Sequence, residues 1–296
     1  MLRLERVLTR PILEPRMNVP WEKDTVFNSA ALHDNGKFHL LYRAVSHNPG
    51  DLNRSSIGYA WSDDGIHFQR LDEPVLYSNV APEEAKGVED PRVVKIGETF
   101  YMLYTAYDGA RTQIAMATSR DLINWDRHGV IMSNRLFGNN KDASLFPEKI
   151  QGRWCLMHRP EPDIYLSFSE NMHDWTDHAR VMKPEFEWES AKIGAGAQPI
   201  MTDQGWLIVY HGVDREMKYR LGIALLDLKD PRKVVKRQPE WILQAEQGWE
   251  VEGDVKNVVF TCGAILLDRR LWVYYGGADS VIGLACADVD DFLGTP

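Results

Sequence analysis

Five copies of one short pattern recur along this chain and limit what it can fold into. Each copy opens on an aromatic residue or leucine, continues through apolar residues, and reaches a Tyr or His four positions later. The copies start about 50 to 65 residues apart, and the residues at that fifth position are Tyr42, Tyr104, His158, Tyr210 and Tyr275. Self-similarity at a fixed period indicates an array of equal structural units.

Each copy is the second strand of a four-stranded unit. Short apolar runs separated by Gly, Asp and Asn dominate, and sustained helical periodicity is rare, which indicates an all-β fold. A first strand is predicted ten residues before each copy, and these first strands begin near Asn28, Asp90, Ser144, Gly196 and Thr261. A third strand follows in every unit, and a fourth follows in four of them.

The fifth unit has no fourth strand before the chain ends at Pro296. The segment Arg10–Pro15 resembles the fourth strand at Glu73–Leu76, so we expect it to pair with the last unit. Such units bury their faces only against their neighbours, which requires a closed ring. We therefore predict a single domain over residues 1–296, a five-bladed β-propeller closed by its N-terminal strand. A β-sandwich or two separate β domains would not need five repeats in register.

The repeat brings charged residues together at one end of the predicted central channel. First and second strands are antiparallel, so the start of one meets the end of the other. Asp90 lies in Gly87–Val94, where Pro91 belongs at the beginning of a strand. Gly194 and Gly196 are expected to open space for a ligand. The residues predicted to converge include Asp90, Asp279, Arg43, Arg159, His211, Lys141 and Lys192.

This combination predicts a particular chemistry. Singly, each residue has a plain structural interpretation, such as a turn carboxylate, a paired ion or a solvated lysine. Together, Arg, Lys and His suit a multiply charged oxyanion such as phosphate. A carboxylate beside them suits proton donation to a leaving oxygen. An inverting hydrolase would need a second carboxylate to activate water, whereas phosphate arrives already anionic.

Composition limits the kinds of molecule that this chain is expected to bind. The net charge of −9 argues against nucleic acid. The first fifteen residues hold no apolar leader, and no run is long enough to span a membrane. Three cysteines in apolar surroundings, Cys155, Cys262 and Cys286, predict reduced thiols and a cytoplasmic protein. No His or Cys spacing predicts a metal site, and no cofactor is expected. The sequence leaves a homo-oligomer open.

Several motifs together resemble glycoside hydrolase family 130, the inverting β-mannoside phosphorylases, over nearly the whole chain. They are Phe27–Ala30, Glu89–Arg92, Leu145–Lys149, His158–Pro160, Lys192–Gly196, Tyr210–Gly212, Asn257–Phe260 and Tyr274–Asp279. The family fold is a five-bladed propeller, in agreement with the repeat count. The form of Asp142–Lys149 looks more like the β-1,2-mannoside branch than the β-1,4 branch.

The resemblance also implies roles for single residues. Asp90 would be the sole general acid, passing its proton through the mannose 3-hydroxyl to the bridging oxygen. Arg159, Lys192 and His211 match phosphate-binding positions, and Lys141 lies where some members have Arg. Asn28, Arg43 and Asp279 match positions that hold the mannose, and the carboxylates Glu89 and Asp142 are expected to bind substrate as well. Glu148 departs from members that have Arg there.

The preferred function is therefore phosphorolysis of β-linked mannobiose or short β-linked manno-oligosaccharides. We expect the linkage to be β-1,2. The products would be α-mannose 1-phosphate and a shortened mannoside, with inorganic phosphate as the co-substrate. A β-mannosidase that uses water is the first alternative, with Glu148 or Glu161 as its base. A non-catalytic glycan-binding propeller is the second. A mannosyltransferase would need a nucleotide sugar, for which there is no signature.

Overall fold

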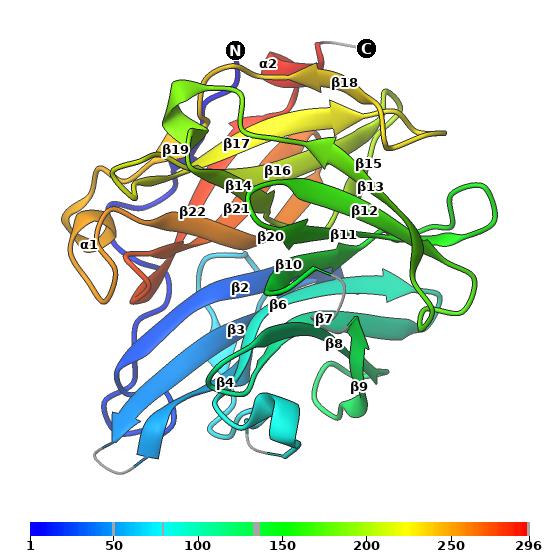
Figure 1. The fold of residues 1–296 in the computed structure, drawn as a ribbon. Helices are drawn as coiled ribbons and strands as arrows, with labels where there is room; N and C mark the ends of the chain where they lie inside the picture. The colour runs from blue at the N-terminus through cyan, green and yellow to red at the C-terminus, as the bar shows by residue number, and fades with distance from the viewer. Residues whose placement is uncertain (49–50, 79, 133–136, 295–296) are drawn as a thin grey trace.

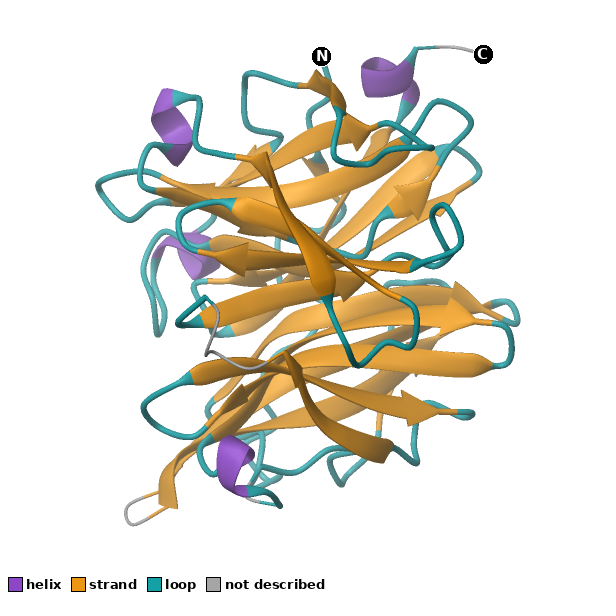
Figure 2. Ribbon diagram, turned by 45° about the vertical axis from the view of Figure 1, so that its right-hand side comes forward, coloured by secondary structure: helices purple, strands orange, loops and turns teal. Residues whose placement is uncertain are grey.

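The computed structural model describes residues 1–48, 51–78, 80–132 and 137–294. Its regular structure is nearly all β, as the sequence predicts, with 22 strands in the described residues (Figure 2). The α-helices are single short turns, α1 (Gly248–Val251) and α2 (Asp290–Leu293). Two 3₁₀ turns cover Pro82–Glu84 and Glu187–Glu189.

The strands form five successive groups, which we number I to V (Figure 1). Group I contains β2 (Thr25–Asp34), β3 (Lys37–Asn48), β4 (Asp51–Ser62) and β5 (Gln69–Arg70). Group II contains β6 (Gly87–Ile96), β7 (Thr99–Tyr107), β8 (Thr112–Ser119) and β9 (Asp126–Met132). Group III contains β10 (Asn140–Leu145), β11 (Trp154–Pro160), β12 (Ile164–Ser169) and β13 (Thr176–Met182).

The last two groups are built less regularly. Group IV contains β14 (Lys192–Ala195), β15 (Ile200–Met201), β16 (Trp206–Val213), β17 (Tyr219–Leu226), β18 (Val234–Arg237) and β19 (Leu243–Gln244). Group V contains β20 (Val259–Leu267), β21 (Arg270–Gly277), β22 (Val281–Asp288) and, from the other end of the chain, β1 (Glu5–Arg6). Neighbouring strands within every group are antiparallel. One parallel pair, Ser55 with Gly87, joins groups I and II into an eight-stranded sheet, so the five groups make four sheets.

Tight turns set the register between the first two strands of a group. Asn35 and Gly36 both have positive φ, 50° and 74°, and connect β2 to β3 as the Asn-Gly pair of a two-residue hairpin. Asp268 and Arg269 make the equivalent turn between β20 and β21. Group III differs, because residues 146–153 separate β10 from β11. This longer connection shifts the register of group III relative to the sequence repeat.

The N-terminal segment lies along the last strand of group V (Figure 1). Arg6 pairs with Ala285, and further along, Leu13 pairs with Ile282. In group I, Leu76 pairs with Ile57 in the same way, which matches the resemblance of the two segments in the sequence. The two ends of the chain are therefore hydrogen-bonded into one sheet.

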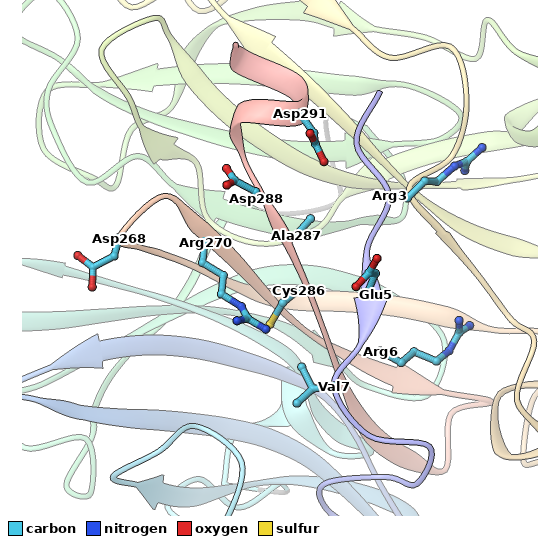
Figure 3. A pocket seen from close by; sticks show the side chains of 10 residues that line it. All are labelled: Arg3, Glu5, Arg6, Val7, Asp268, Arg270, Cys286, Ala287, Asp288 and Asp291. Carbon is cyan, nitrogen blue, oxygen red and sulfur yellow. The ribbon is translucent and has the colours of Figure 1, made fainter. Parts of the chain in front are cut away.

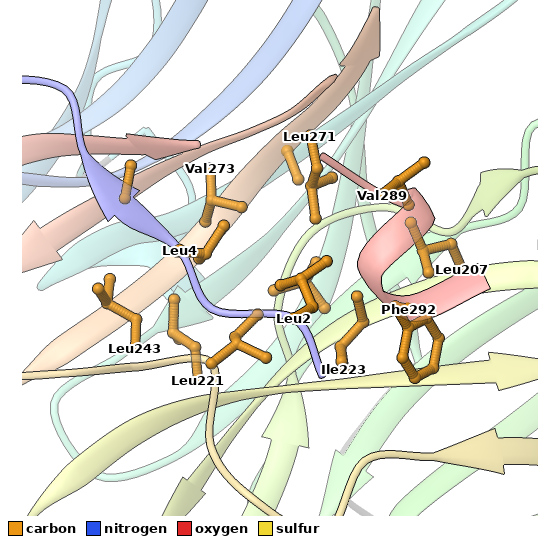
Figure 4. Close-up of a cluster of buried hydrophobic side chains, with 14 of the residues drawn as sticks. Leu2, Leu4, Leu207, Leu221, Ile223, Leu243, Leu271, Val273, Val289 and Phe292 are labelled. Atoms are coloured by element: carbon orange, nitrogen blue, oxygen red, sulfur yellow. The ribbon is translucent and has the colours of Figure 1, made fainter. Parts of the chain in front are cut away.

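The packing of the two chain ends is also apolar. Leu2 and Leu4 are buried in a cluster that includes Leu221, Val273 and Phe292 (Figure 4). These side chains come from the N-terminal segment, group IV, group V and α2, so the cluster ties the first residues to both of the last groups. In the part of the chain that the structure describes, no helix has the length and apolar character needed to cross a membrane.

Candidate functional site

The first strands of the groups and the ends of their second strands line a cavity of about 160 Å³. Nine of the ten site residues predicted from the sequence line it: Asn28, Arg43, Asp90, Lys141, Asp142, Arg159, Lys192, His211 and Asp279. The tenth, Glu89, does not line the cavity but accepts a hydrogen bond from Arg43. Tyr219, Val255, Val258 and Phe260 complete the wall. The sequence prediction therefore gathered residues that the fold does bring together.

A bulge in the first strand presents one polar residue in each of groups I to III. Asn28, Asp90 and Asp142 have positive φ values of 47°, 50° and 57°, and each coincides with a register shift in its strand pair. Short polar side chains tolerate this left-handed conformation better than others. The bulge turns the three side chains into the cavity from equivalent positions.

The equivalent position in group III was misplaced by the sequence repeat. Counting ten residues back from Trp154 gave Ser144, whereas the structure has Asp142 at the bulge. The path from Asp142 to His158 is two residues longer than the path from Asp90 to Tyr104. The longer β10–β11 connection contains these extra residues, so a fixed count fails in this group.

Asp90 is held by two donors on one oxygen. Asn28 Nδ2 lies 2.9 Å and Arg43 Nη1 lies 3.1 Å from Asp90 Oδ1. Burial by itself would raise the pKa of Asp90, but the charges of Arg43, Arg92 and Lys141 and the Asn28 bond outweigh it and lower the pKa. The resting site therefore favours the carboxylate, and a negatively charged ligand bound beside it would raise the pKa of Asp90.

The neighbouring carboxylates have the opposite character. Burial raises the pKa of Glu89, although Arg43 Nη2 lies 2.7 Å from its Oε1. Burial also raises the pKa of Asp279 to about 7, against the lowering effect of Arg43. Asp279 is thus largely protonated below pH 7 and can donate a hydrogen bond to a sugar hydroxyl.

Arg92 is a functional candidate that the sequence prediction missed. Its side chain is fully buried and crosses from β6 to β10 and β14. Nη1 donates to the Asp90 carbonyl at 2.9 Å, Nε to the Gly196 carbonyl at 3.0 Å, and Nη2 lies 3.3 Å from Asp142 Oδ1. The only signal in the sequence was its place in the Gly87–Val94 stretch, because the bulge at Asp90 interrupts the alternation of faces between Glu89 and Arg92.

The cationic side of the cavity is organised by two carboxylates. Arg159 Nε lies 2.7 Å from Asp142 Oδ2, although its N–H bond does not point at that oxygen. Arg159 Nη1 donates to Glu161 Oε1 at 2.7 Å, and Lys192 Nζ donates to the same oxygen at 3.0 Å. Glu161 thus bridges the two cations, and its side chain is 53% exposed.

His211 is present at the predicted place but is not a cation. Burial lowers its pKa to about 3 despite the nearby Asp142, so the ring is neutral. Its Nε2 lies 3.8 Å from Asp142 Oδ2, and its buried Nδ1 has no hydrogen-bond partner among the described residues. His211 can therefore give or accept a hydrogen bond from a ligand, but it does not add positive charge.

Two further expectations are wrong. Gly194 does not make room for a ligand, because an added Cβ would lie 2.3 Å from His211 Cε1 and 2.7 Å from Asp142 Oδ2. Gly196 likewise lies against the Val209 carbonyl. Glu148 is exposed in the connection at the far end of β10 from Lys141, so it is not at the cavity.

A larger cavity of about 600 Å³ lies elsewhere, beside β1 and β22 (Figure 3). Its charges are mixed, and two of its arginines, Arg3 and Arg6, are already engaged. Arg6 makes two 2.7 Å bonds to Glu250, and Arg3 donates to the Trp241 carbonyl. This cavity lacks the convergent acid and cations of the first one.

Comparison with known proteins gives one consistent family. Residues 3–295 match the family described as beta-1,4-mannooligosaccharide phosphorylase, glycoside hydrolase family 130. A 1,2-beta-oligomannan phosphorylase of Thermoanaerobacter sp. (strain X514) is 48% identical over 299 residues, covering 98% of this chain and 99% of the relative. A beta-1,2-mannobiose phosphorylase of the same organism is also 48% identical, covering 96% and 97%. The solved structure of the Listeria innocua beta-1,2-mannobiose phosphorylase with beta-1,2-mannobiose has a TM-score of 0.89 at 29% identity, covering 99% and 98%.

Proposed function

This chain belongs to glycoside hydrolase family 130, and on that premise we propose that it is a β-1,2-mannoside phosphorylase. It cleaves β-1,2-mannobiose or short β-1,2-manno-oligosaccharides with inorganic phosphate. The products are α-mannose 1-phosphate and a mannoside shortened by one sugar. The β-1,2 linkage is supported by the two relatives at 48% identity, whose names both specify it.

One observation supports phosphate as the nucleophile. Lys141, Arg159 and Lys192 line the same cavity as Asp90 although the chain as a whole carries a charge of −9. The overall field would repel phosphate, so local cations are needed to attract it. Glu161 lies 2.7 Å from Arg159 and 3.0 Å from Lys192, which is the kind of contact that a phosphate oxygen would make.

The proposed reaction is a single displacement. A phosphate oxygen forms a bond to the anomeric carbon while the bond from that carbon to the bridging oxygen breaks. Asp90 supplies the proton that the leaving oxygen takes up, through the mannose 3-hydroxyl. Attack from the face opposite the leaving group converts the β configuration to α. No cofactor is needed beyond phosphate.

The remaining residues are assigned to the sugar and to support. Asn28, Arg43 and Asp279 line the cavity on the side of Asp90, where they hold the mannose of the cleaved bond. His211 binds phosphate as a neutral hydrogen-bonding group. Asp142 orients Arg159 and Arg92, and Glu89 orients Arg43, so we assign both carboxylates to positioning in addition to any contact with substrate.

We also propose that the fold is one five-bladed β-propeller over residues 1–296, closed by β1. The five strand groups support it, since their first strands are mutual neighbours: β2 contacts β6 and β20, and β10 contacts β6 and β14. The pairing of Arg6 with Ala285 supports closure. A cytoplasmic location is consistent with three buried, unpaired cysteines, Cys155, Cys262 and Cys286.

The experiment that tests this function uses the purified protein with β-1,2- and β-1,4-mannobiose, each with and without phosphate. We expect mannose 1-phosphate only from the β-1,2 isomer and only in phosphate buffer. Release of free mannose at the same rate in phosphate-free buffer would show that water is the nucleophile. In that case Glu161, the carboxylate at the cations, would be tested as the base.

A further inference from the structure

A buried brace of three residues recurs in four of the five strand groups. A tyrosine on the second strand donates its hydroxyl to a buried glutamate that precedes the first strand or lies in a short helical turn. An arginine from the outer strand or N-terminal segment pairs with the same glutamate. The sets are Tyr42–Glu22–Arg16 with Arg70, Tyr104–Glu84–Arg127, Tyr210–Glu189–Arg237 and Tyr275–Glu250–Arg6.

The strand register gives these braces one geometry. Each tyrosine lies opposite a small residue of the third strand: Gly58, Ala115, Gly222 or Gly283. A Cβ at Gly58 or Gly222 would lie 2.4 Å from the tyrosine Cζ, so the ring needs that space. Two residues further on, an alanine faces the arginine: Ala60 with Arg70, Ala117 with Arg127, Ala224 with Arg237 and Ala285 with Arg6.

Group III replaces every part of this brace that the structure describes. His158 is in the position of the tyrosine, and the residue opposite it is Tyr165, which fills the space that the other groups keep open. Ser167 takes the place of the alanine, and His178 contacts it from the outer strand. The ring of Phe137 packs against His158 and His178, with centroids 5.2 Å and 4.9 Å away.

The replacements form one hydrogen-bonded chain. His178 Nδ1 and Ser167 Oγ are 2.7 Å apart, Ser167 Oγ and His158 Nε2 are 2.7 Å apart, and His158 Nδ1 lies 3.1 Å from Asn140 Oδ1. Because an amide oxygen only accepts, Nδ1 of His158 carries the hydrogen and Nε2 accepts from Ser167. His158, Ser167 and Asn140 are fully buried. Burial also lowers the pKa of His158 to about 3, which keeps the ring neutral.

This series of hydrogen bonds, from His178 to Asn140, ends beside the cations of the candidate site. Asn140 immediately precedes Lys141, and His158 immediately precedes Arg159. Lys141 and Arg159 are partners in the β10–β11 register. Neighbouring residues of a strand point to opposite faces, so the His158–Asn140 bond fixes from behind the two strand ends that present these cations.

We propose that His158, acting with Asn140, is a positioning residue for phosphate binding: it holds Lys141 and Arg159 in the arrangement that receives the anion. This inference rests on the proposed phosphorolysis. Group III, which contains both Lys141 and Arg159, has the neutral His158–Asn140 hydrogen bond at the place where the other four groups have a brace with charged residues.

The test compares Michaelis constants for the two substrates. His158→Phe keeps the ring and its packing but removes both hydrogen bonds, and Ser167→Ala removes only the link behind His158. We expect His158→Phe to raise the KM for phosphate about 3- to 10-fold, the size of one buried hydrogen bond, while the KM for the mannoside changes less than about twofold. Ser167→Ala should act in the same direction with a smaller size. Asn140→Ala combined with His158→Phe should add little to the stronger single change, because the two act as a pair.

Tyr104→Phe is the matched control, since it removes the equivalent hydroxyl from the brace of group II. It should lower the melting temperature and leave the ratio of the two Michaelis constants unchanged. Equal changes in both constants for a folded His158→Phe and for Ser167→Ala would overturn the positioning role. A wild-type protein that needs no phosphate would instead overturn the proposed function, so the two failures are distinguishable.

Discussion

At the scale of single residues, the backbone conformation of Asp90 determines where its carboxylate lies in the candidate site. Its φ of 50° belongs to the left-handed region, which costs energy for most residues. In return, the bulge aims the carboxylate at Asn28 and Arg43 and away from the strand ladder. The position therefore calls for a short polar residue that tolerates this backbone, and the proposed reaction adds the need for a titratable group.

Asp90→Asn separates these two requirements. Asparagine tolerates the same backbone and can still accept from Arg43, so the melting temperature should stay near that of the wild type. It has no proton to transfer, so phosphorolysis should fall by about 10² to 10⁴-fold. Steady-state rates and a melting curve on the same preparation check both parts. Near wild-type turnover in the folded variant would show that Asp90 is only a turn residue.

A substitution of Glu161 is predicted to improve phosphate binding, in contrast to the loss of activity expected for Asp90→Asn. Its carboxylate bridges Arg159 and Lys192, so an incoming phosphate must compete with it. Glu161→Gln removes the competing charge, and we expect the KM for phosphate to fall a few-fold because the side chain is half-exposed and screened. The KM for the mannoside serves as the internal control. A higher KM for phosphate would show that Glu161 holds the cations in place and does not compete.

The titration of Asp279 predicts a pH dependence of stability. Burial raises the pKa of Asp279 from 3.8 to about 7 in the folded protein, so between these values the folded chain binds a proton that the unfolded chain has lost. The contribution of this group is therefore present at low pH and is lost as the pH rises toward 7. Asp279→Asn does not titrate. We expect the melting temperature of the wild type, relative to this variant, to drop by about 5 to 10 °C between pH 4 and pH 7. A constant difference would contradict the raised pKa.

At the scale of strands and turns, the sequence predicts where strands and turns lie along the chain better than it predicts which side chains contact one another. The central strands are correctly found because their apolar runs repeat, and the turn at Asn35–Gly36 has an unambiguous signal. The register of group III is missed because the extra length of residues 146–153 is invisible to a fixed count. The neutral state of His211 and the clash that requires Gly194 depend on packing between strands, which no local pattern encodes.

The recurring brace gives a prediction at this scale. Glu84 is 3% exposed and Arg127 is 20% exposed, so removing the arginine leaves a buried carboxylate whose one remaining side-chain partner among the described residues is the Tyr104 hydroxyl. Arg127→Met should destabilise the protein by about 3 kcal/mol. Adding Glu84→Gln should recover part of that loss, because the uncompensated charge disappears. Denaturant unfolding of both variants measures the free energy of unfolding. A double variant less stable than the single one would contradict the explanation that the unpaired charge of Glu84 causes the loss.

At the scale of the whole molecule, the two ends of the chain are held in one sheet by the same kinds of contact. Leu2 and Leu4 are buried against the last two groups, Arg6 binds the buried Glu250, and Leu13 pairs with Ile282. Two of these contacts have equivalents elsewhere in the described residues: groups I, II and IV have the brace, and group I has the Leu76–Ile57 pair. Group V obtains its outer strand and the arginine of its brace from residues more than 200 positions away in the chain.

Deletion of residues 1–15 should therefore destabilise the molecule far more than an ordinary terminal truncation. It uncovers the cluster around Val273 and Phe292, where each buried leucine removed typically costs about 2 to 5 kcal/mol, and it leaves Glu250 buried without its cation. We expect a fall in melting temperature of more than about 10 °C, measured by calorimetry. Arg10→Ala, at an exposed position of the same segment, is the matched control and should melt like the wild type. A synthetic peptide of residues 1–15 should restore part of the lost stability when added to the truncated protein, because the groove that receives it remains. A truncated protein that melts at the same temperature as the full-length one would mean that group V is stable without β1, and it would count against the proposed closure of the propeller.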